Sequence, residues 1–221
     1  MRNDERLRTI YEVMAPYIVR NEHNWRDYLA FASQFHKHSF DNILLVYAQD
    51  EDVSILATRK QWAAIGRNLI PRAKGVAVCV YRNAKLTLDY LFDVSQTTGK
   101  EIHPTDWQLS DEMKEALTER LSYAHGFPKQ GFSQALYALA SESVADNYNH
   151  FLQELKQETK GHLFTEIPAG GFEAQYIQLL TDSISYFIGK KCHLPDEEIQ
   201  LSDGMATVSH FNTLPLVAHL G

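Results

Sequence analysis

The sequence predicts an α+β fold, in which N-terminal helices pack on a small, mainly antiparallel sheet and a mostly helical region follows. Apolar residues recur at three- and four-residue spacing in several segments, which indicates amphipathic helices. β-branched and aromatic runs typical of strands occur between residues 53 and 94. A hydrophobic content of 44% and a charged content of 22% over 221 residues are ordinary for a globular protein with a buried core.

Three helices are expected before the sheet. Apolar positions repeat with helical spacing over residues 4–19. Asn24 is a candidate N-cap for a second helix over residues 25–36, and Ser39 for a short third helix over residues 40–49. Both side chains suit this position because each accepts a hydrogen bond from a free amide of the first helical turn.

The sheet is expected to begin with a short strand over residues 53–58, followed by a short helix over residues 59–65. Gly66 suits the left-handed position that ends a helix. Residues 75–83 and 85–94 carry the β-branched and aromatic side chains of two strands. The short break between these two segments predicts a hairpin.

A polar stretch over residues 99–109, which contains Pro104, is the predicted linker between two domains. Residues 1–98 form the predicted α+β domain, and residues 110–221 form the predicted helical domain. The apolar end NTLPLVAHLG lacks the polar character common at chain ends, so we expect the helical domain to be truncated there. Helices in this domain are expected over residues 110–124, 133–160 and 171–191.

Charge is distributed unevenly along the chain. The whole sequence has a net charge of −7, but its first 90 residues carry 13 basic and 10 acidic side chains, and the remaining 131 carry 8 and 18. Between Val53 and Leu88 there is no acidic residue. Charge of one sign in a folded segment can hold an anion such as a phosphate backbone. The basic residues of this segment are Arg59, Lys60, Arg67, Arg72, Lys74, Arg82 and Lys85.

Aromatic residues lie among these cations. Non-specific binding of single-stranded nucleic acid uses cations along the phosphates and flat rings that stack on unpaired bases. Trp62, Tyr81 or Trp25 could supply the rings. In the alternative interpretation the tryptophans belong to the core and the cations form a solvated face.

The sequence shows no motif of a known catalytic or cofactor site. It contains no HExxH, no pair of histidines four residues apart, no glycine-rich phosphate loop and no GxSxG. Cys79 and Cys192 are isolated, so no disulfide framework is expected. No signal peptide and no membrane-length apolar run is present. We therefore expect a cytoplasmic protein without a membrane partner, a metal, another cofactor or a catalytic residue.

The first hundred residues resemble the N-terminal domain of ArdC-type antirestriction proteins, which also occurs in LtrC-like proteins of conjugative plasmids and transposons. The matching segments are, in order, WRDYLAFASQF, SFDNILLVYAQ, ATRKQWAAIGR, PRAKGVAV and LFDVSQT. The resemblance implies binding of single-stranded DNA. One departure is Arg72-Ala73, where the family usually has Gly-Glu before the Lys-Gly pair, which makes this turn more basic.

In ArdC-type proteins a zinc metallopeptidase-like domain follows, with an HExxH motif and a third ligand, a Glu, on a later helix. The segment YIQLLTDSISYFIGKKCHL resembles that later helix, with Asp182 where the Glu would lie. Because HExxH is missing, the resemblance implies a degenerate, metal-free relative over the helical domain.

The leading hypothesis is a non-enzymatic, single-stranded DNA-binding module of a mobile-element protein, with a role in antirestriction, DNA transfer or replication. The alternative is an interaction or scaffold domain, motivated by the acidic helical half and by the apolar residues Leu216 and Val217. The partners of such a domain would be further domains of the same polypeptide or conjugation proteins. A hydrolase with an unrecognised site is a third possibility. In the leading hypothesis Trp62 and Tyr81 stack on bases, and Asn42 and Gln49 hydrogen-bond either to bases or to the protein's own backbone. The phosphate contacts are then Arg59, Lys60, Arg67, Arg72, Lys74 and Arg82.

Overall fold

The computed structural model describes residues 3–35, 37–83, 85–102, 109–128, 131–158 and 171–220. It confirms the α+β class, with helices over most of the described chain and two small antiparallel sheets. Contacts divide the chain into two units, each described here by itself. The first unit contains Met1–Met14 and Gln34–Asp106, and the second contains Ala15–Ser33 and Trp107–Gly221. The division therefore differs from the expected 1–98 and 110–221, because Ala15–Ser33 belongs with the helical unit.

The helices of the first unit follow from local capping chemistry. The helix α1 (Asn3–Ile18) contributes its first part to this unit. The helix α3 (Phe40–Gln49) begins after Ser39, whose side chain accepts a hydrogen bond from the backbone amide of Asn42, as predicted. The helix α4 (Arg59–Ala64) begins with a capping box between Thr58 and Gln61. Gly66 follows this helix with a φ of 80°, which confirms its predicted role.

The main sheet has the strand order β1-β4-β3, formed by β1 (Leu56–Thr58), β4 (Lys85–Asp93) and β3 (Val76–Arg82). The predicted hairpin is confirmed by antiparallel pairing that runs from Val76 opposite Leu91 to Arg82 opposite Lys85. The first predicted strand is shorter than expected because only its last three residues pair with β4.

A second, two-stranded sheet joins β2 (Arg67–Leu69) to β5 (Thr97–Gly99), with a 3-10 turn, η1 (Val94–Gln96), just before β5. The sequence did not predict these elements. Strands of three residues are too short to show alternation, and residues 97–99 appeared to begin the polar linker.

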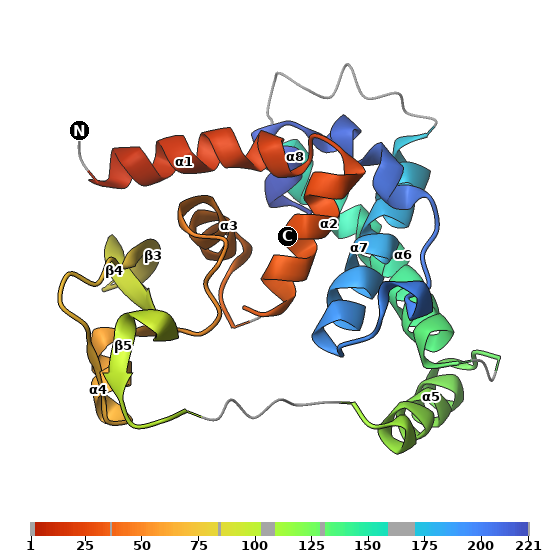
Figure 1. Ribbon diagram of the computed structural model, residues 1–221. Helices are drawn as coiled ribbons and strands as arrows, with labels where there is room; N and C mark the ends of the chain where they lie inside the picture. Colours follow the sequence, from red (N-terminus) through yellow and green to blue (C-terminus); the bar gives the residue numbers. More distant parts are fainter. Residues whose placement is uncertain are drawn as a thin grey trace. The chain divides into compact units, whose positions relative to one another are not determined.

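The outer edge of β3 is covered by side chains of α3, which lies beside it (Figure 1). The Asn42 amide donates to the Cys79 carbonyl and accepts from the Cys79 N–H, each at 2.8 Å. The Gln49 amide pairs with Ala77 in the same way, at 2.9 and 3.0 Å. Seven residues separate Asn42 from Gln49, so both lie on one face of the helix. Each amide imitates the peptide group of a neighbouring strand, which protects the edge from unwanted pairing.

The second unit is helical. Its helices α6 (Phe132–Glu158) and α7 (Phe172–Lys191) lie side by side, and α5 (Asp111–His125) packs on α6 (Figure 1). Ser110 caps α5 as expected, while the predicted end of α6 at Gly161 lies outside the described residues. Short elements complete this unit: η2 (Asp196–Glu198), η3 (Gly204–Phe211) and α8 (Leu214–Ala218).

The helix α2 (Glu22–Ser33) packs on α7, which explains its place in the second unit. Trp25 is fully buried, and its indole N–H donates to the Ser183 hydroxyl at 2.8 Å. The helix begins three residues earlier than expected because its cap is Asn21, whose side chain accepts from the Asn24 amide at 2.9 Å. The predicted cap at Asn24 is therefore wrong.

Asp182, the residue compared with a zinc ligand, is fully buried and holds the chain after α7. Its carboxylate accepts hydrogen bonds from the backbone amides of Ser202 and Gly204, both at 2.8 Å. A Cβ at Gly204 would lie 2.5 Å from the backbone of Gln178, so η3 approaches α7 more closely than any other residue type would allow. Asp182 thus has a structural role in this unit.

The apolar residues near the end of the chain are buried inside the second unit. Leu216 is 7% exposed and Val217 is fully buried. Leu216 and Val217 therefore offer no apolar surface to another domain, which removes one of the two observations that motivated the scaffold alternative. Within the described residues, no helix has the length and apolar character needed to cross a membrane.

Candidate nucleic-acid interface

A tight turn after β2 lies at the centre of the basic segment. The Ala73 amide donates to the Ile70 carbonyl at 3.2 Å, and Pro71 occupies the second position. Arg72, in the third position, has a φ of 65°. A turn with this backbone normally has Gly or Asn there, because a side chain in the left-handed region costs about 1–2 kcal/mol. Such strain is common at functional sites, which makes Arg72 a candidate contact residue.

Gln96 holds the two ends of this turn. Its backbone carbonyl accepts from the Ile70 amide at 3.0 Å, and its side-chain Oε1 accepts from the Lys74 amide at 2.7 Å. Gly75 follows the turn, and a Cβ there would lie 2.9 Å from the Phe92 ring. The turn is therefore fixed by η1 on one side and by β4 on the other.

Arg67 joins the two strands of the smaller sheet and is half-buried. Its Nε donates to the Thr97 hydroxyl at 2.7 Å, its Nη2 to the Thr97 carbonyl at 3.0 Å and its Nη1 to the Lys100 carbonyl. Of the five N–H donors of a guanidinium, three are used in this way. Arg67 therefore contributes a positive charge in a fixed position and keeps two donors for a ligand.

Three arginines that are separated in sequence meet around one pocket of about 560 Å³, which we call the arginine pocket. None of the described residues that line it is acidic. Three positive charges around one concave surface concentrate the field there and favour an anionic ligand. The residues that line the arginine pocket are Arg59, Ala63, Arg67, Asn68, Leu69, Ile70, Pro71, Arg72 and Ala73.

The predicted cations differ in how much of their charge is available. Arg59, Lys60, Arg72 and Lys74 are exposed, and none of their side chains has a hydrogen bond or an ion pair with another residue of the described chain. Arg82, in contrast, forms an ion pair with Asp89. The charge of Arg82 is largely compensated, so the unpaired cations are the stronger candidates for phosphate contacts.

The predicted stacking role of Trp62 is wrong. Trp62 is only 2% exposed, and its indole N–H donates to the Phe92 carbonyl at 2.8 Å, so it belongs to the core of the first unit. Trp25 is also buried, as described above. Tyr81 is 79% exposed near the end of β3, but it does not line the arginine pocket. Of the proposed rings, Tyr81 alone keeps a free face.

Asn42 and Gln49 are also removed from the predicted contacts with bases, since both amides pair with the backbone of β3. Pairing with the protein's own backbone was the predicted alternative to base contact, and it is confirmed. Tyr90 was missed, although it is 43% exposed. Strand alternation could not have found it, because Leu86, Leu88 and Tyr90 alternate with polar residues, a pattern that predicts a buried face of β4.

Asp93, at the end of β4, fixes the chain that leads into β1. Its carboxylate accepts from the backbone amides of Ser54 at 2.7 Å, Ile55 at 3.0 Å and Ser95 at 2.9 Å. Burial raises the pKa of Asp93, but the hydrogen bonds from Ser54, Ser95 and Ile55 outweigh burial and hold this pKa below its ordinary value. The charged form therefore stabilises the scaffold beneath the basic turn.

No group of three or more His, Cys, Asp or Glu side chains that could hold a metal occurs in the described part of the chain. No family model, no curated protein and no solved structure matches the chain. The resemblance to the ArdC-type N-terminal domain, and the expectation that the protein is not an enzyme, therefore stay predictions.

Proposed function

We propose that the first unit binds single-stranded DNA through the arginine pocket and the unpaired cations beside it, without catalysing a reaction. The observation that carries this proposal is the meeting of Arg59, Arg67 and Arg72 around a pocket whose described lining has no carboxylate. Guanidinium groups suit this task because their forked donors match two phosphate oxygens at once.

The surrounding cations extend the positive surface. Lys60 follows Arg59 at the start of α4, and Lys74 follows the strained turn that carries Arg72. A strand that passes the pocket would meet further positive charge on both sides. Contacts of this kind recognise the sugar–phosphate backbone and not the sequence of bases.

The ordered motifs of the first hundred residues favour single-stranded DNA over other polyanions, since they resemble the ArdC-type N-terminal domain. On this basis we propose a cytoplasmic protein of a conjugative plasmid or transposon that acts in antirestriction, DNA transfer or replication. Its further partners would be other domains of the same polypeptide or conjugation proteins, and the second unit would be a metal-free relative of the metallopeptidase-like domain.

The test is a fluorescence-anisotropy titration with a labelled oligo(dT) of about 16 nucleotides, the upper end of common site sizes. The expected result is binding at low salt that weakens as salt is added, because phosphate contacts release condensed counterions. An absence of binding at low salt, or an affinity that does not respond to salt, would contradict the proposal. Polyglutamate is the matched competitor, because it carries negative charge without bases or phosphates.

A further inference from the structure

A second pocket adjoins the arginine pocket and shares Arg59 with it. Its volume is about 480 Å³, and we call it the tyrosine pocket. One wall is the start of α4, and the other is the hairpin. The residues that line it are Thr58, Arg59, Lys60, Gln61, Arg82, Asp89, Tyr90 and Phe92.

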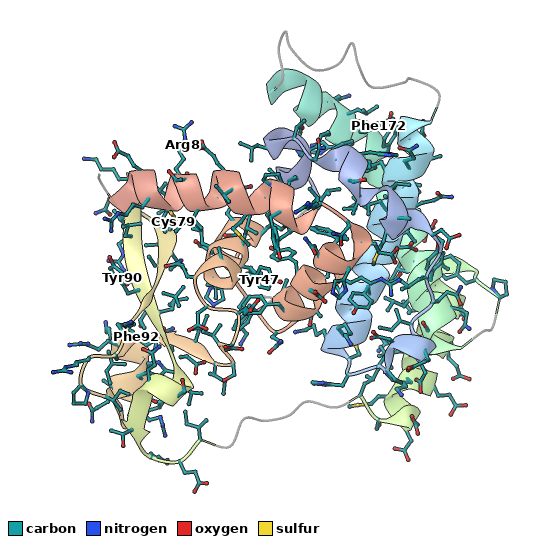
Figure 2. All side chains as sticks on the ribbon, turned by 45° about the horizontal axis from the view of Figure 1, so that its top comes forward. Arg8, Tyr47, Cys79, Tyr90, Phe92 and Phe172 are labelled. Carbon is teal, nitrogen blue, oxygen red and sulfur yellow. The ribbon has the colours of Figure 1, made fainter. Side chains whose placement is uncertain are left out.

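Tyr90 is the exposed ring of this pocket. It lies opposite Ala77 in the hairpin, and Phe92 lies two residues further along the same face of β4 (Figure 2). Gly75 leaves the space into which the Phe92 ring fits, since a Cβ there would lie 2.9 Å from that ring and 3.0 Å from the Tyr90 Cβ. Tyr90 is thus placed by close packing at its base, while 43% of the residue remains exposed.

The described lining of this pocket also carries charge. Asp89 is the one acidic residue among these described residues, and it lies on the opposite face of β4 from Tyr90. Its carboxylate pairs with Arg82 and accepts a hydrogen bond from the backbone amide of Tyr90 at 2.9 Å. Arg59 and Lys60, which also line the tyrosine pocket, keep unpaired positive charge. The tyrosine pocket therefore combines an aromatic residue with cations, whereas none of the described residues that line the arginine pocket is aromatic.

Each nucleotide of a single strand presents a phosphate and, next to it, a planar base. We infer that the tyrosine pocket is a base-stacking subsite, in which an unpaired base lies on the Tyr90 ring while a neighbouring phosphate occupies the arginine pocket and Arg59 lies between them. This inference rests on the proposed function and adds to it a source of strand preference. Bases within a duplex are already stacked and paired, so a duplex would gain only the phosphate contacts.

The experiment compares oligo(dT) with an oligonucleotide of equal length whose central nucleotides are abasic, which keeps the phosphates and removes the bases. The wild-type protein is expected to bind oligo(dT) about tenfold more tightly, the order of one base–aromatic stack. Tyr90→Ala should bring this ratio close to one, and Tyr90→Phe should keep it, because the ring and not the hydroxyl makes the stack.

The matched control is Tyr123→Ala, at a 93% exposed ring of the second unit, and it should leave the ratio unchanged. Tyr81→Ala, at the exposed ring outside the tyrosine pocket, distinguishes a stack on Tyr90 from a stack at the hairpin end. Far-ultraviolet circular dichroism establishes that each variant is folded, and Tyr90→Leu supplies a second ring-free variant with an apolar side chain.

Three results would overturn the inference. Equal affinity of the wild-type protein for the two oligonucleotides would show that no base is engaged, while the proposed function would stand. A ratio lost in Tyr81→Ala and kept in Tyr90→Ala would move the stack to the hairpin end. If neither oligonucleotide binds at low salt, or if polyglutamate displaces oligo(dT) at equal charge, both the inference and the proposed function fall.

Discussion

Each unit carries a pocket of similar size, but the two pockets have opposite charge. Among the described residues, the arginine pocket of the first unit is lined by three arginines and no carboxylate, whereas a pocket of about 650 Å³ in the second unit is lined by five carboxylates and one lysine. That lysine, Lys114, is itself paired with Asp111 at 3.3 Å. Although the net charge is −7, the arginine pocket should attract a polyanion and the acidic pocket of the second unit should repel it. The carboxylates of the acidic pocket are Asp111, Glu115, Glu119, Glu197 and Glu198.

The largest expected effect comes from reversing charge in the arginine pocket. In Arg59→Glu/Arg72→Glu, the affinity for oligo(dT) should fall at least about 25-fold at 0.1 M salt, the loss expected for two phosphate contacts on a single strand. Anisotropy measures this change. The matched control Arg6→Glu/Arg120→Glu alters the net charge equally at exposed residues that line neither pocket, and it should bind like the wild type. Equal losses in both double variants would mean that net charge alone governs binding.

Asp93→Asn tests the role of charge in the first unit. The substitution should lower the free energy of unfolding by about 2–3 kcal/mol at pH 7, because the charged acceptor of the Ser54, Ile55 and Ser95 amides is lost. The folded pKa of Asp93 lies below the unfolded value of about 3.9, so its stabilisation is present above that pH and is lost as the pH falls through the folded pKa.

Urea unfolding from pH 7 down to pH 2.5 measures this difference. The gap between the wild type and Asp93→Asn should close at the acid end. A gap that stays constant over this range would show that charge is not what Asp93 contributes. Asp182→Asn is the corresponding variant of the second unit and should lower stability without changing the affinity for oligo(dT).

Asn42→Ala distinguishes a structural role of Asn42 from a contact with DNA bases. It leaves the backbone groups of Cys79 without their side-chain partner and should lower stability by about 1–2 kcal/mol. Chemical denaturation measures the loss. The affinity for oligo(dT) in conditions where the variant is folded should equal that of the wild type. A weaker affinity with unchanged stability would restore Asn42 to the set of base contacts.

Arg72→Gly should change stability and binding in opposite directions. Glycine relieves the left-handed backbone and should stabilise the first unit by up to about 1 kcal/mol, whereas the loss of one phosphate contact should weaken binding about fivefold. Arg72→Lys keeps the charge and the strain, so both quantities should stay near wild type. Thermal unfolding and anisotropy on the same samples test this, and a parallel change in both quantities would refute a functional reason for the strain.

The sequence predicted what local chemistry determines. Ser39, Gly66 and the hairpin follow from capping, left-handed glycine and strand composition, which act over a few residues. The two interpretations of Trp62, a stacking ring or a core residue, could not be separated in this way, because its indole N–H pairs with the carbonyl of Phe92, thirty residues away. The smaller sheet was missed because its strands have three residues each.

The sequence predicted the positive charge of the candidate site but not the arrangement of its residues in space. An acid-free run of sequence located Arg59 and Arg72, yet only the turn and the two small sheets bring them together around one pocket. The alternation in β4 predicts a buried Tyr90 and not an exposed one, and the assignment of Ala15–Ser33 to the helical unit depends on the packing of α2 against α7. Apolar periodicity marks the buried face of a helix but does not identify the segment that packs against it.

The salt dependence of oligo(dT) binding tests the central claim most directly. With four exposed, unpaired cations on phosphates, a plot of log affinity against log salt should have a slope of about −3, and it should be about half as steep in Arg59→Gln/Arg72→Gln. A slope near zero in the wild-type protein, or a slope unchanged by the two substitutions, would contradict a phosphate-binding role for the arginine pocket.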